Sequence, residues 1–300
     1  MKQKAPRATE RRNARTRGLD AMSTLGILRA IHREDATVAR AVARAIPAIA
    51  RAVDATVVAL NRGGRVFYVG AGTSGRLATL DAAEIPPTFG TPARKVQAVI
   101  AGGWRALTHA VEGAEDNEGQ GARDLAARRL TRNDAVIGIT ASGATPYVLG
   151  ALAYARRRGA VVIGITSNPR TPVTRLAPIS IVTETGPEAI TGSTRMKAGT
   201  AQKMVLNMLS TAVMTRLGRV YDNWMIGVAL TNRKLKQRGL RILAEASGSS
   251  VAEATRALRQ SGHDLRAALI ILKSGVDART ARRLLRKAGG DLRAALAARK

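Results

Sequence analysis

Apolar residues recur along the chain in two patterns. Between residues 36 and 60 they return every three or four positions, which places them on one face of a helix. We predict a helix there, with a kink at Pro47 and a terminating turn at residues 61–64. The apolar positions on this face are Val38, Val42, Ile46, Ile49, Val53, Val57 and Leu60.

After this helix, short aliphatic runs alternate with helical stretches. The helical stretches include residues 146–158 and a long Met- and Leu-rich segment at residues 194–217. Strands that alternate with helices are typical of an α/β fold, in which helices cover both faces of a parallel sheet. The runs predicted as buried strands are residues 65–69, 96–100, 135–139, 161–165 and 179–182.

The C-terminal part of the chain has a different pattern. The run from His263 to Leu269 recurs between Gly290 and Leu296, with Asp264 matched by Asp291 and Asp-Leu-Arg-Ala-Ala-Leu common to both. Two copies are too few for a solenoid. We therefore predict a compact helical appendage from about residue 240.

Composition limits the chemistry that the chain can use. Cysteine is absent, which excludes disulfides, thiolate nucleophiles and Cys-based zinc sites. The three histidines are far apart in sequence, so we expect no metal site. No apolar run reaches about 18 residues, and no apolar stretch follows the basic start. We therefore expect a soluble, cytoplasmic protein with no membrane association.

The net charge of +28 suggests a nucleic-acid partner until it is divided by segment. Residues 1–19 carry +6 and residues 231–300 carry +12, so the 211 residues between them carry only +10. The basic runs lack interleaved aromatic residues or a complete helix-turn-helix pattern. We expect no nucleic-acid partner, although such a binder stays an alternative.

The first glycine loop, Gly70-Ala-Gly-Thr-Ser-Gly75, follows a predicted strand and matches the G-x-G-x-x-G pattern of dinucleotide sites. Those sites need an acidic residue about 20 positions later, which holds a ribose. Lys95 stands there, and the strand at 96–100 runs into Ala101-Gly-Gly103 without an acid. The sequence therefore argues against a dinucleotide, and we expect no cofactor.

The second loop, Thr140-Ala-Ser-Gly-Ala-Thr-Pro146, opens a predicted helix. Ser142 and Thr145 supply hydroxyl groups, Gly143 lets backbone N–H groups approach a ligand, and the helix N-terminus favours an anion. The alternative is an ordinary cap with Thr145 at the N-cap position. The loop is unusually rich in small hydroxyl residues, so we favour a phosphate site. A small sugar phosphate fits two such loops.

We expect carboxylates to provide any general acid–base catalysis in this chain, because cysteine and a G-x-S-x-G motif are both absent. Glu84 precedes Pro86-Pro87, where we predict that the helix breaks and turns this side chain back toward the loops. A second candidate group is the acidic cluster at residues 112–118, although such a cluster is usually a solvated face.

Five longer runs carry a resemblance, nearly collinear from about residue 9 to the C-terminus. Together they closely resemble the N-acetylmuramic acid 6-phosphate etherase family, whose members are built on a sugar isomerase (SIS) domain. The runs are Val69-Gly-Ala-Gly-Thr-Ser-Gly-Arg-Leu77, Asp81-Ala-Ala-Glu-Ile-Pro-Pro-Thr-Phe-Gly90, Val111-Glu-Gly-Ala-Glu-Asp116, Ala141-Ser-Gly-Ala-Thr-Pro-Tyr-Val148 and Thr191-Gly-Ser-Thr-Arg-Met-Lys-Ala-Gly-Thr-Ala-Gln-Lys203.

The resemblance implies a three-layer SIS-type sandwich with a central parallel sheet and a small C-terminal helical region. It suggests an N-terminal arm and helices at residues 1–60 that pack on the core or on a partner subunit. Residues 61–230 would form the sugar-phosphate-binding SIS domain, and residues 231–300 the helical region. Because the family is dimeric, the resemblance also implies a homodimer with a shared active site.

The implied activity is a lyase of cell-wall sugar recycling. It would cleave the D-lactyl ether of N-acetylmuramate 6-phosphate by elimination and hydration, which gives N-acetylglucosamine 6-phosphate and D-lactate. The family's catalytic glutamates fall on Glu84, as the acid that protonates the departing lactate, and on Glu115, as the base at C2. The implied substrate-binding residues are Thr73, Ser74, Ser142, Gly143, Thr145, Ser193, Thr194, Arg195 and Lys197.

Two departures from the family pattern bear on substrate affinity: Ala83 replaces a serine that is common before the glutamate, and Ala144 replaces a common arginine. Two rival functions remain, a non-catalytic sugar-phosphate sensor and a sugar-phosphate isomerase. The presence of both Glu84 and Glu115 disfavours the sensor, which needs no acid–base pair.

Overall fold

The computed structural model describes residues 7–230 and 232–298. They form two compact units, one from residues up to 82 together with 94–210, the other from residues 83–93 together with 211 onward. The predicted division at residues 60/61 and 230/231 stays a prediction. Residues 1–6 of its N-terminal arm, and residues 231, 299 and 300 of its C-terminal region, lie outside the described residues.

The first unit contains a five-stranded parallel sheet in the order β2-β1-β3-β4-β5. All five predicted strands are confirmed, with shifts of at most one residue. Continuous runs of Val and Ile form these strands because both faces of a parallel sheet are buried. The bounds are β1 (Val66–Gly70), β2 (Val96–Ile100), β3 (Ala135–Ile139), β4 (Val161–Thr166) and β5 (Ile179–Val182).

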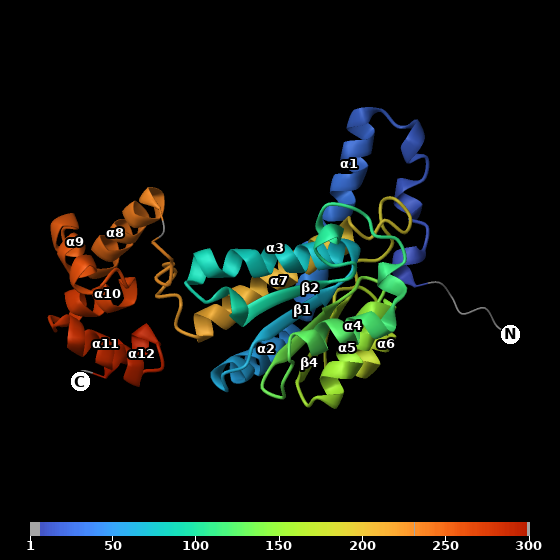
Figure 1. The fold of residues 1–300 in the computed structure, drawn as a ribbon. Helices are drawn as coiled ribbons and strands as arrows, with labels where there is room; N and C mark the ends of the chain where they lie inside the picture. The colour runs from blue at the N-terminus through green and yellow to red at the C-terminus, as the bar shows by residue number, and fades with distance from the viewer. Residues whose placement is uncertain (1–6, 231, 299–300) are drawn as a thin grey trace. The chain divides into compact units, whose positions relative to one another are not determined.

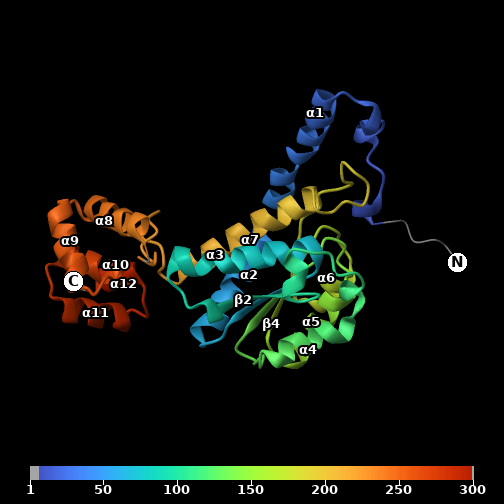
Figure 2. The same ribbon diagram turned by 45° about the horizontal axis from the view of Figure 1, so that its top comes forward.

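Helices cover both faces of the sheet, which confirms the predicted three layers (Figures 1 and 2). Successive residues of a strand point alternately to one face of the sheet and to the other. Phe67 and Val69 face the first set of helices, in a core with Tyr147 and Leu152. That set is α4 (Glu118–Ala127), α5 (Pro146–Arg157) and α6 (Pro172–Leu176), and the other is α2 (Val38–Asn61), α3 (Gly72–Phe89) and α7 (Lys197–Arg216).

The structure corrects the predicted helix break at Pro86-Pro87. Helix α3 continues through both prolines to Phe89, and the Gly90 N–H still donates to the Pro86 carbonyl at 2.9 Å. Ile85 and Phe89, one turn apart, are buried, so tertiary packing holds the helix where proline would otherwise end it. Helix α2 is likewise continuous through Pro47.

An N-terminal arm precedes the helices of the core. It consists of three short 3₁₀ turns, η1 (Ala8–Glu10), η2 (Ala14–Thr16) and η3 (Leu19–Ala21), followed by α1 (Thr24–Asp35). Buried hydrogen bonds tie it to the core. Asn168 Nδ2 donates to Thr9 Oγ1 at 3.1 Å, and Thr16 Oγ1 donates to the Ala189 carbonyl at 2.8 Å. Residues near position 10 therefore lie against the core.

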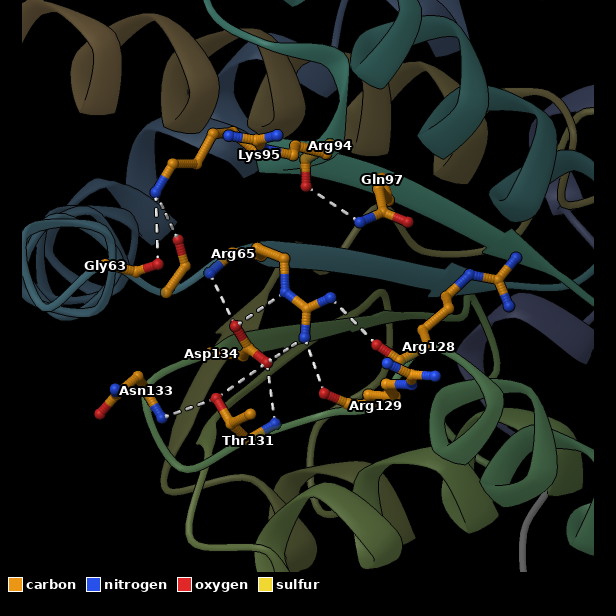
Figure 3. Close-up of polar contacts among 11 residues, drawn as sticks. Gly63, Arg65, Arg94, Lys95, Gln97, Arg128, Arg129, Thr131, Asn133 and Asp134 are labelled. Atoms are coloured by element: carbon orange, nitrogen blue, oxygen red, sulfur yellow. Dashed lines mark hydrogen bonds and ion pairs between the residues drawn. The ribbon is translucent and has the colours of Figure 1, made fainter.

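A polar network ties the amino-terminal ends of β1 and β3 together (Figure 3). The Arg65 guanidinium donates to Asp134 Oδ2 at 2.8 Å and to the carbonyls of Arg128 and Arg129 at 3.0 and 2.8 Å. Burial alone would raise the pKa of Asp134, but hydrogen bonds from Arg65 and Thr131 lower it overall. This network lies at the edge of the sheet opposite the glycine loops, which identifies it as structural.

Short 3₁₀ turns occur in the connections around β2. They are η4 (Ala93–Lys95), η5 (Trp104–Leu107) and η6 (Ala114–Asp116).

The second unit is helical, as predicted for the C-terminal region. Asp264 and Asp291, the two matched positions of the repeat, each cap a helix by accepting bonds from two backbone N–H groups. The repeat is therefore a repeated helix start. The helices are α8 (Arg233–Ser247), α9 (Val251–Gln260), α10 (Leu265–Ser274), α11 (Ala278–Lys287) and α12 (Leu292–Ala297).

Candidate functional site

The carboxyl ends of β1 and β3 open into a cavity of about 410 Å³. Both predicted loops line it, and three other segments of the first unit contribute to it. Parallel strands place their carboxyl ends at one edge, so loops 70 residues apart in sequence meet there. The lining residues are Glu10, Ala71, Gly72, Thr73, Ser74, Glu115, Asp116, Ile139, Thr140, Ala141, Ser142, Ala144, Thr145, Pro146 and Thr194.

The loop after β3 presents three hydrogen-bonded hydroxyl groups to the cavity. Thr140 Oγ1 lies 2.7 Å from Thr145 Oγ1 and 3.2 Å from Ser142 Oγ, and Ser142 Oγ also accepts from the Ala144 N–H at 3.2 Å. Thr145 is the N-cap residue of α5, but its side chain makes no capping bond. Its hydroxyl group therefore belongs to the cavity network, beside the positive end of a twelve-residue helix.

Gly143 gives this loop its shape. Its φ of +72° lies in the left-handed region, and an added Cβ would approach the side chain of Thr171 to 2.4–2.6 Å. Only glycine fits between the cavity and helix α6. Gly143 does not itself line the cavity, but its neighbours Ser142 and Ala144 do.

The loop after β1 contributes the first turn of α3, which begins at Gly72. Thr73 and Ser74 line the cavity, as the resemblance implies. Ser74 Oγ lies 2.9 Å from Gln202 Oε1 on α7, and both side chains are buried there. This contact joins the first turn of α3 to α7 and holds the Ser74 hydroxyl in place.

Three carboxyl groups line the cavity. Glu115 and Asp116 come from η6, and Glu10 comes from the N-terminal arm. Asp116 belongs to the acidic cluster that the sequence offered as a candidate group, although it was not singled out there. Glu10 was missed, because no local pattern marks it, about 60 residues before the first loop. Among the described residues that line this cavity there is no lysine, arginine or histidine.

Glu84 is not among the residues that line this cavity. It belongs to the second unit and is exposed on α3, whereas the residues lining the cavity all belong to the first unit. Because α3 is continuous, Glu84 follows Ser74 by ten residues on the same helix, roughly 15 Å along its axis. The helix break that was predicted to turn its side chain back toward the loops does not occur.

The segment before α7 divides between two environments. Thr194 lines the cavity, flanked by half-buried Ser193 and exposed Arg195, which do not line it. Lys197 is buried away from the cavity, and its Nζ lies 2.6 Å from Glu34 Oε2 on α1. The ammonium group of Lys197 is therefore occupied by an internal ion pair.

Glu34 stands at the centre of that ion pair. Its other carboxylate oxygen accepts from Arg15 Nε at 2.6 Å. Burial alone would raise the pKa of Glu34, but hydrogen bonds from Arg15, Lys197 and Asn13 outweigh it and lower the pKa to about 2. The pair fastens the N-terminal arm and α1 to α7, and so fixes the segment that carries Glu10.

The described parts of the chain contain no group of three or more His, Cys, Asp or Glu residues arranged to hold a metal ion. In the same residues, no helix combines the length and the apolar character that crossing a membrane requires.

Comparison with known proteins supports the SIS fold. The sequence profile of the glucokinase regulatory protein N-terminal SIS domain matches residues 48–156, and the general SIS domain profile matches residues 114–212. The structure is similar to that of a phosphoheptose isomerase from Francisella tularensis, with a TM-score of 0.52, 22% identity and coverage of 65% of this chain and 100% of the other. At that identity the likeness concerns the fold alone.

Curated relatives are much closer in sequence. The N-acetylmuramic acid 6-phosphate etherase of Yersinia pestis (strain Pestoides F) is 53% identical over 270 residues, which cover 90% of this chain and 92% of the relative. That of Enterobacter sp. (strain 638) is 51% identical, with 90% and 91% covered. The etherase of Geobacillus thermodenitrificans (strain NG80-2) is 50% identical over 265 residues, with 88% and 90% covered. The chain belongs to the N-acetylmuramic acid 6-phosphate etherase family.

Proposed function

We propose that this chain is a carbon–oxygen lyase that cleaves the D-lactyl ether of N-acetylmuramate 6-phosphate. The products are N-acetylglucosamine 6-phosphate and D-lactate, and the reaction serves cell-wall sugar recycling in the cytoplasm. The chain belongs to the etherase family, and the observation that carries the proposal is that a hydroxyl-rich loop, a helix N-terminus and the Glu115 carboxyl group meet in one cavity.

The 6-phosphate binds at the loop after β3. Ser142 and Thr145 donate hydrogen bonds to its oxygens, and the end of α5 stabilises its charge. Thr73, Ser74 and Thr194 contact the phosphate or the sugar from the other side of the cavity. Gly143 shapes the loop between Ser142 and Thr145, Ser193 and Arg195 flank Thr194, and the ion pair of Lys197 with Glu34 holds the start of α7.

The reaction proceeds by elimination followed by hydration. In the open-chain aldehyde the C2 proton is acidic, and Glu115 removes it. The electron pair of that C–H bond forms the C2–C3 double bond, the C3–O bond breaks, and Glu84 transfers its proton to the departing lactate oxygen. Water then adds at C3, with Glu84 taking its proton, while Glu115 returns a proton to C2.

Glu84 reaches the cavity from a second copy of the chain. The support is its position on the continuous helix α3, exposed and ten residues beyond Ser74. A dimer with two-fold symmetry that pairs Glu84 of one copy with Glu115 of the other has two equivalent sites. The proposal therefore includes a homodimer with a shared active site.

The purified protein is expected to release D-lactate from N-acetylmuramate 6-phosphate without added metal or nucleotide. A coupled D-lactate dehydrogenase assay measures this directly. A folded sample that binds the sugar phosphate but releases no lactate would contradict the lyase and favour the sensor. Interconversion of sugar phosphates without lactate release would favour the isomerase.

The two glutamates are expected to act at different steps. Glu84→Ala is expected to keep exchanging the C2 proton with deuterium from solvent, because Glu115 remains, while lactate release falls by about 10²- to 10⁴-fold. Mass spectrometry of the recovered substrate measures the exchange. Loss of exchange in this variant, together with its retention in Glu115→Ala, reverses the two roles.

A further inference from the structure

A second, smaller cavity lies directly beside the first. It holds about 190 Å³ and shares Ala71, Gly72 and Glu115 with the main cavity. At roughly 30 Å³ for each water in the liquid, it has room for about six waters, which is enough for a lactyl group. Glu115 is the only ionisable residue among the described residues that line both cavities.

The connection after β2 forms the wall of this second cavity, and Arg76 of α3 holds it in shape. Arg76 Nε donates to the carbonyls of Ala106 and Leu107 at 3.0 and 3.1 Å, and its Nη2 donates to the His109 carbonyl at 3.1 Å. Its Nη1 donates no hydrogen bond to any other described residue. The guanidinium therefore shapes the wall and keeps donors for a ligand.

Charge distinguishes the two cavities. The first is lined by the carboxyl groups of Glu10, Glu115 and Asp116 and, within the described residues, by no basic side chain. The second is lined by Arg76 and His109 in addition to Glu112 and Glu115. A substrate with two separate anionic groups can therefore place its phosphate at the hydroxyl-rich loop of the first cavity and its second anionic group beside the guanidinium of the second cavity.

We propose that the second cavity is a binding site for the lactyl group, whose carboxylate is held by Arg76 and His109. The inference rests on the proposed function. The sugar phosphate occupies the first cavity, and the ether bond lies beside Glu115, where the cavities meet. A carboxylate pairs more favourably with a guanidinium than with the acidic lining of the main cavity. Cleavage leaves D-lactate in the second cavity and the sugar in the first.

The test compares two ligands that differ by the lactyl group. Ala110 is exposed and lines the second cavity, so Ala110→Trp fills it without disturbing the core. We expect KM for N-acetylmuramate 6-phosphate to rise by about tenfold or more, because lost binding of the lactyl group removes ground-state affinity. The inhibition constant of N-acetylglucosamine 6-phosphate is expected to stay within about twofold of wild type. The control is Ala127→Trp, at an exposed position of α4 outside both cavities.

A second variant tests the charge. His109→Glu places a carboxylate in the second cavity. It is expected to raise the KM for N-acetylmuramate 6-phosphate about tenfold and to leave the inhibition constant of N-acetylglucosamine 6-phosphate unchanged. The uncharged His109→Gln is expected to have a smaller effect on the KM. Equal weakening of substrate and product by Ala110→Trp or His109→Glu overturns the proposal. So does an unchanged KM for the substrate in both variants.

The same ligands separate this proposal from the proposed function. If the wild-type protein releases no lactate, the proposed lyase function is wrong. Calorimetric titration of the two sugar phosphates into the same variants still decides whether the second cavity recognises the lactyl group. If the wild-type protein binds neither sugar phosphate, both proposals are wrong.

Discussion

A mixed dimer of Glu84→Ala and Glu115→Ala subunits is expected to recover about half of the wild-type turnover, although each variant alone loses about 10²- to 10⁴-fold. In the shared-site arrangement, one of its two sites combines the intact Glu115 of one copy with the intact Glu84 of the other. The second site carries both substitutions and is inactive. Co-expression with two different affinity tags and sequential purification isolate the mixed dimer for the lactate assay.

A reciprocal dimer provides the control. Pairing a wild-type subunit with a Glu84→Ala/Glu115→Ala subunit leaves each shared site with one substituted glutamate, so this dimer is expected to be inactive. If both glutamates acted within one chain, the results would be exchanged: the first mixed dimer would be inactive, and the second would keep about half of the turnover. Failure to isolate any mixed dimer would contradict the shared site altogether.

The second large effect concerns stability. Glu34→Ala is expected to destabilise the first unit by about 3–5 kcal/mol, because it leaves the ammonium of Lys197 buried without its partner. Lys197 is only 1% exposed, so water does not replace the lost carboxylate. The free energy of unfolding in urea, followed by circular dichroism, measures the loss. The double variant Glu34→Leu/Lys197→Met removes both charges and is expected to be more stable than Glu34→Ala.

The same pair predicts a pH dependence. The pKa of Glu34 is lowered from 4.5 to about 2, so the folded state favours the ionised carboxyl group. Its contribution is complete above about pH 4.5 and is lost as the pH falls toward 2. A difference of about 2.5 pKa units corresponds to about 3 kcal/mol.

A variant that cannot titrate at position 34 isolates this contribution. The stability gap between wild type and Glu34→Gln is therefore expected to be largest near neutral pH and to shrink between about pH 4.5 and pH 2. A gap that stays constant over this range, or a Glu34→Ala variant within about 1 kcal/mol of wild type, would contradict the ion pair as a stabilising contact.

Much of the fold was predictable because its signals are local. The five strands follow from short runs of Val and Ile, and the helices α2, α5 and α7 begin and end within about three residues of the predicted positions. The prediction at Pro86-Pro87 was wrong because burial of Ile85 and Phe89 outweighs the local preference of proline. Before helix α2, helices were expected only in general terms, and the bounds of helix α1 and the 3₁₀ turns of the arm were not predicted.

The cavity was only partly predictable. Thr73, Ser74, Ser142 and Thr145 stand directly after strands, and parallel topology brings strand ends together. The place of Glu10 depends instead on the buried bond between Thr9 and Asn168, residues 159 positions apart. The role of Lys197 likewise depends on Glu34, 163 positions away. A motif that contains Lys197 does not reveal that its charge is already paired.

By itself, the sequence determined the alternation of aliphatic strands and helices, the absence of thiol chemistry, and the two hydroxyl-rich loops at strand ends. These properties depend on residue type and local spacing, which folding does not alter. Only the tertiary structure decided that Glu10, Glu115 and Asp116 share a cavity whose lining does not include Glu84, and that Arg76 and His109 line a second cavity beside it. Those properties depend on contacts between distant segments, which the packing of the whole first unit sets.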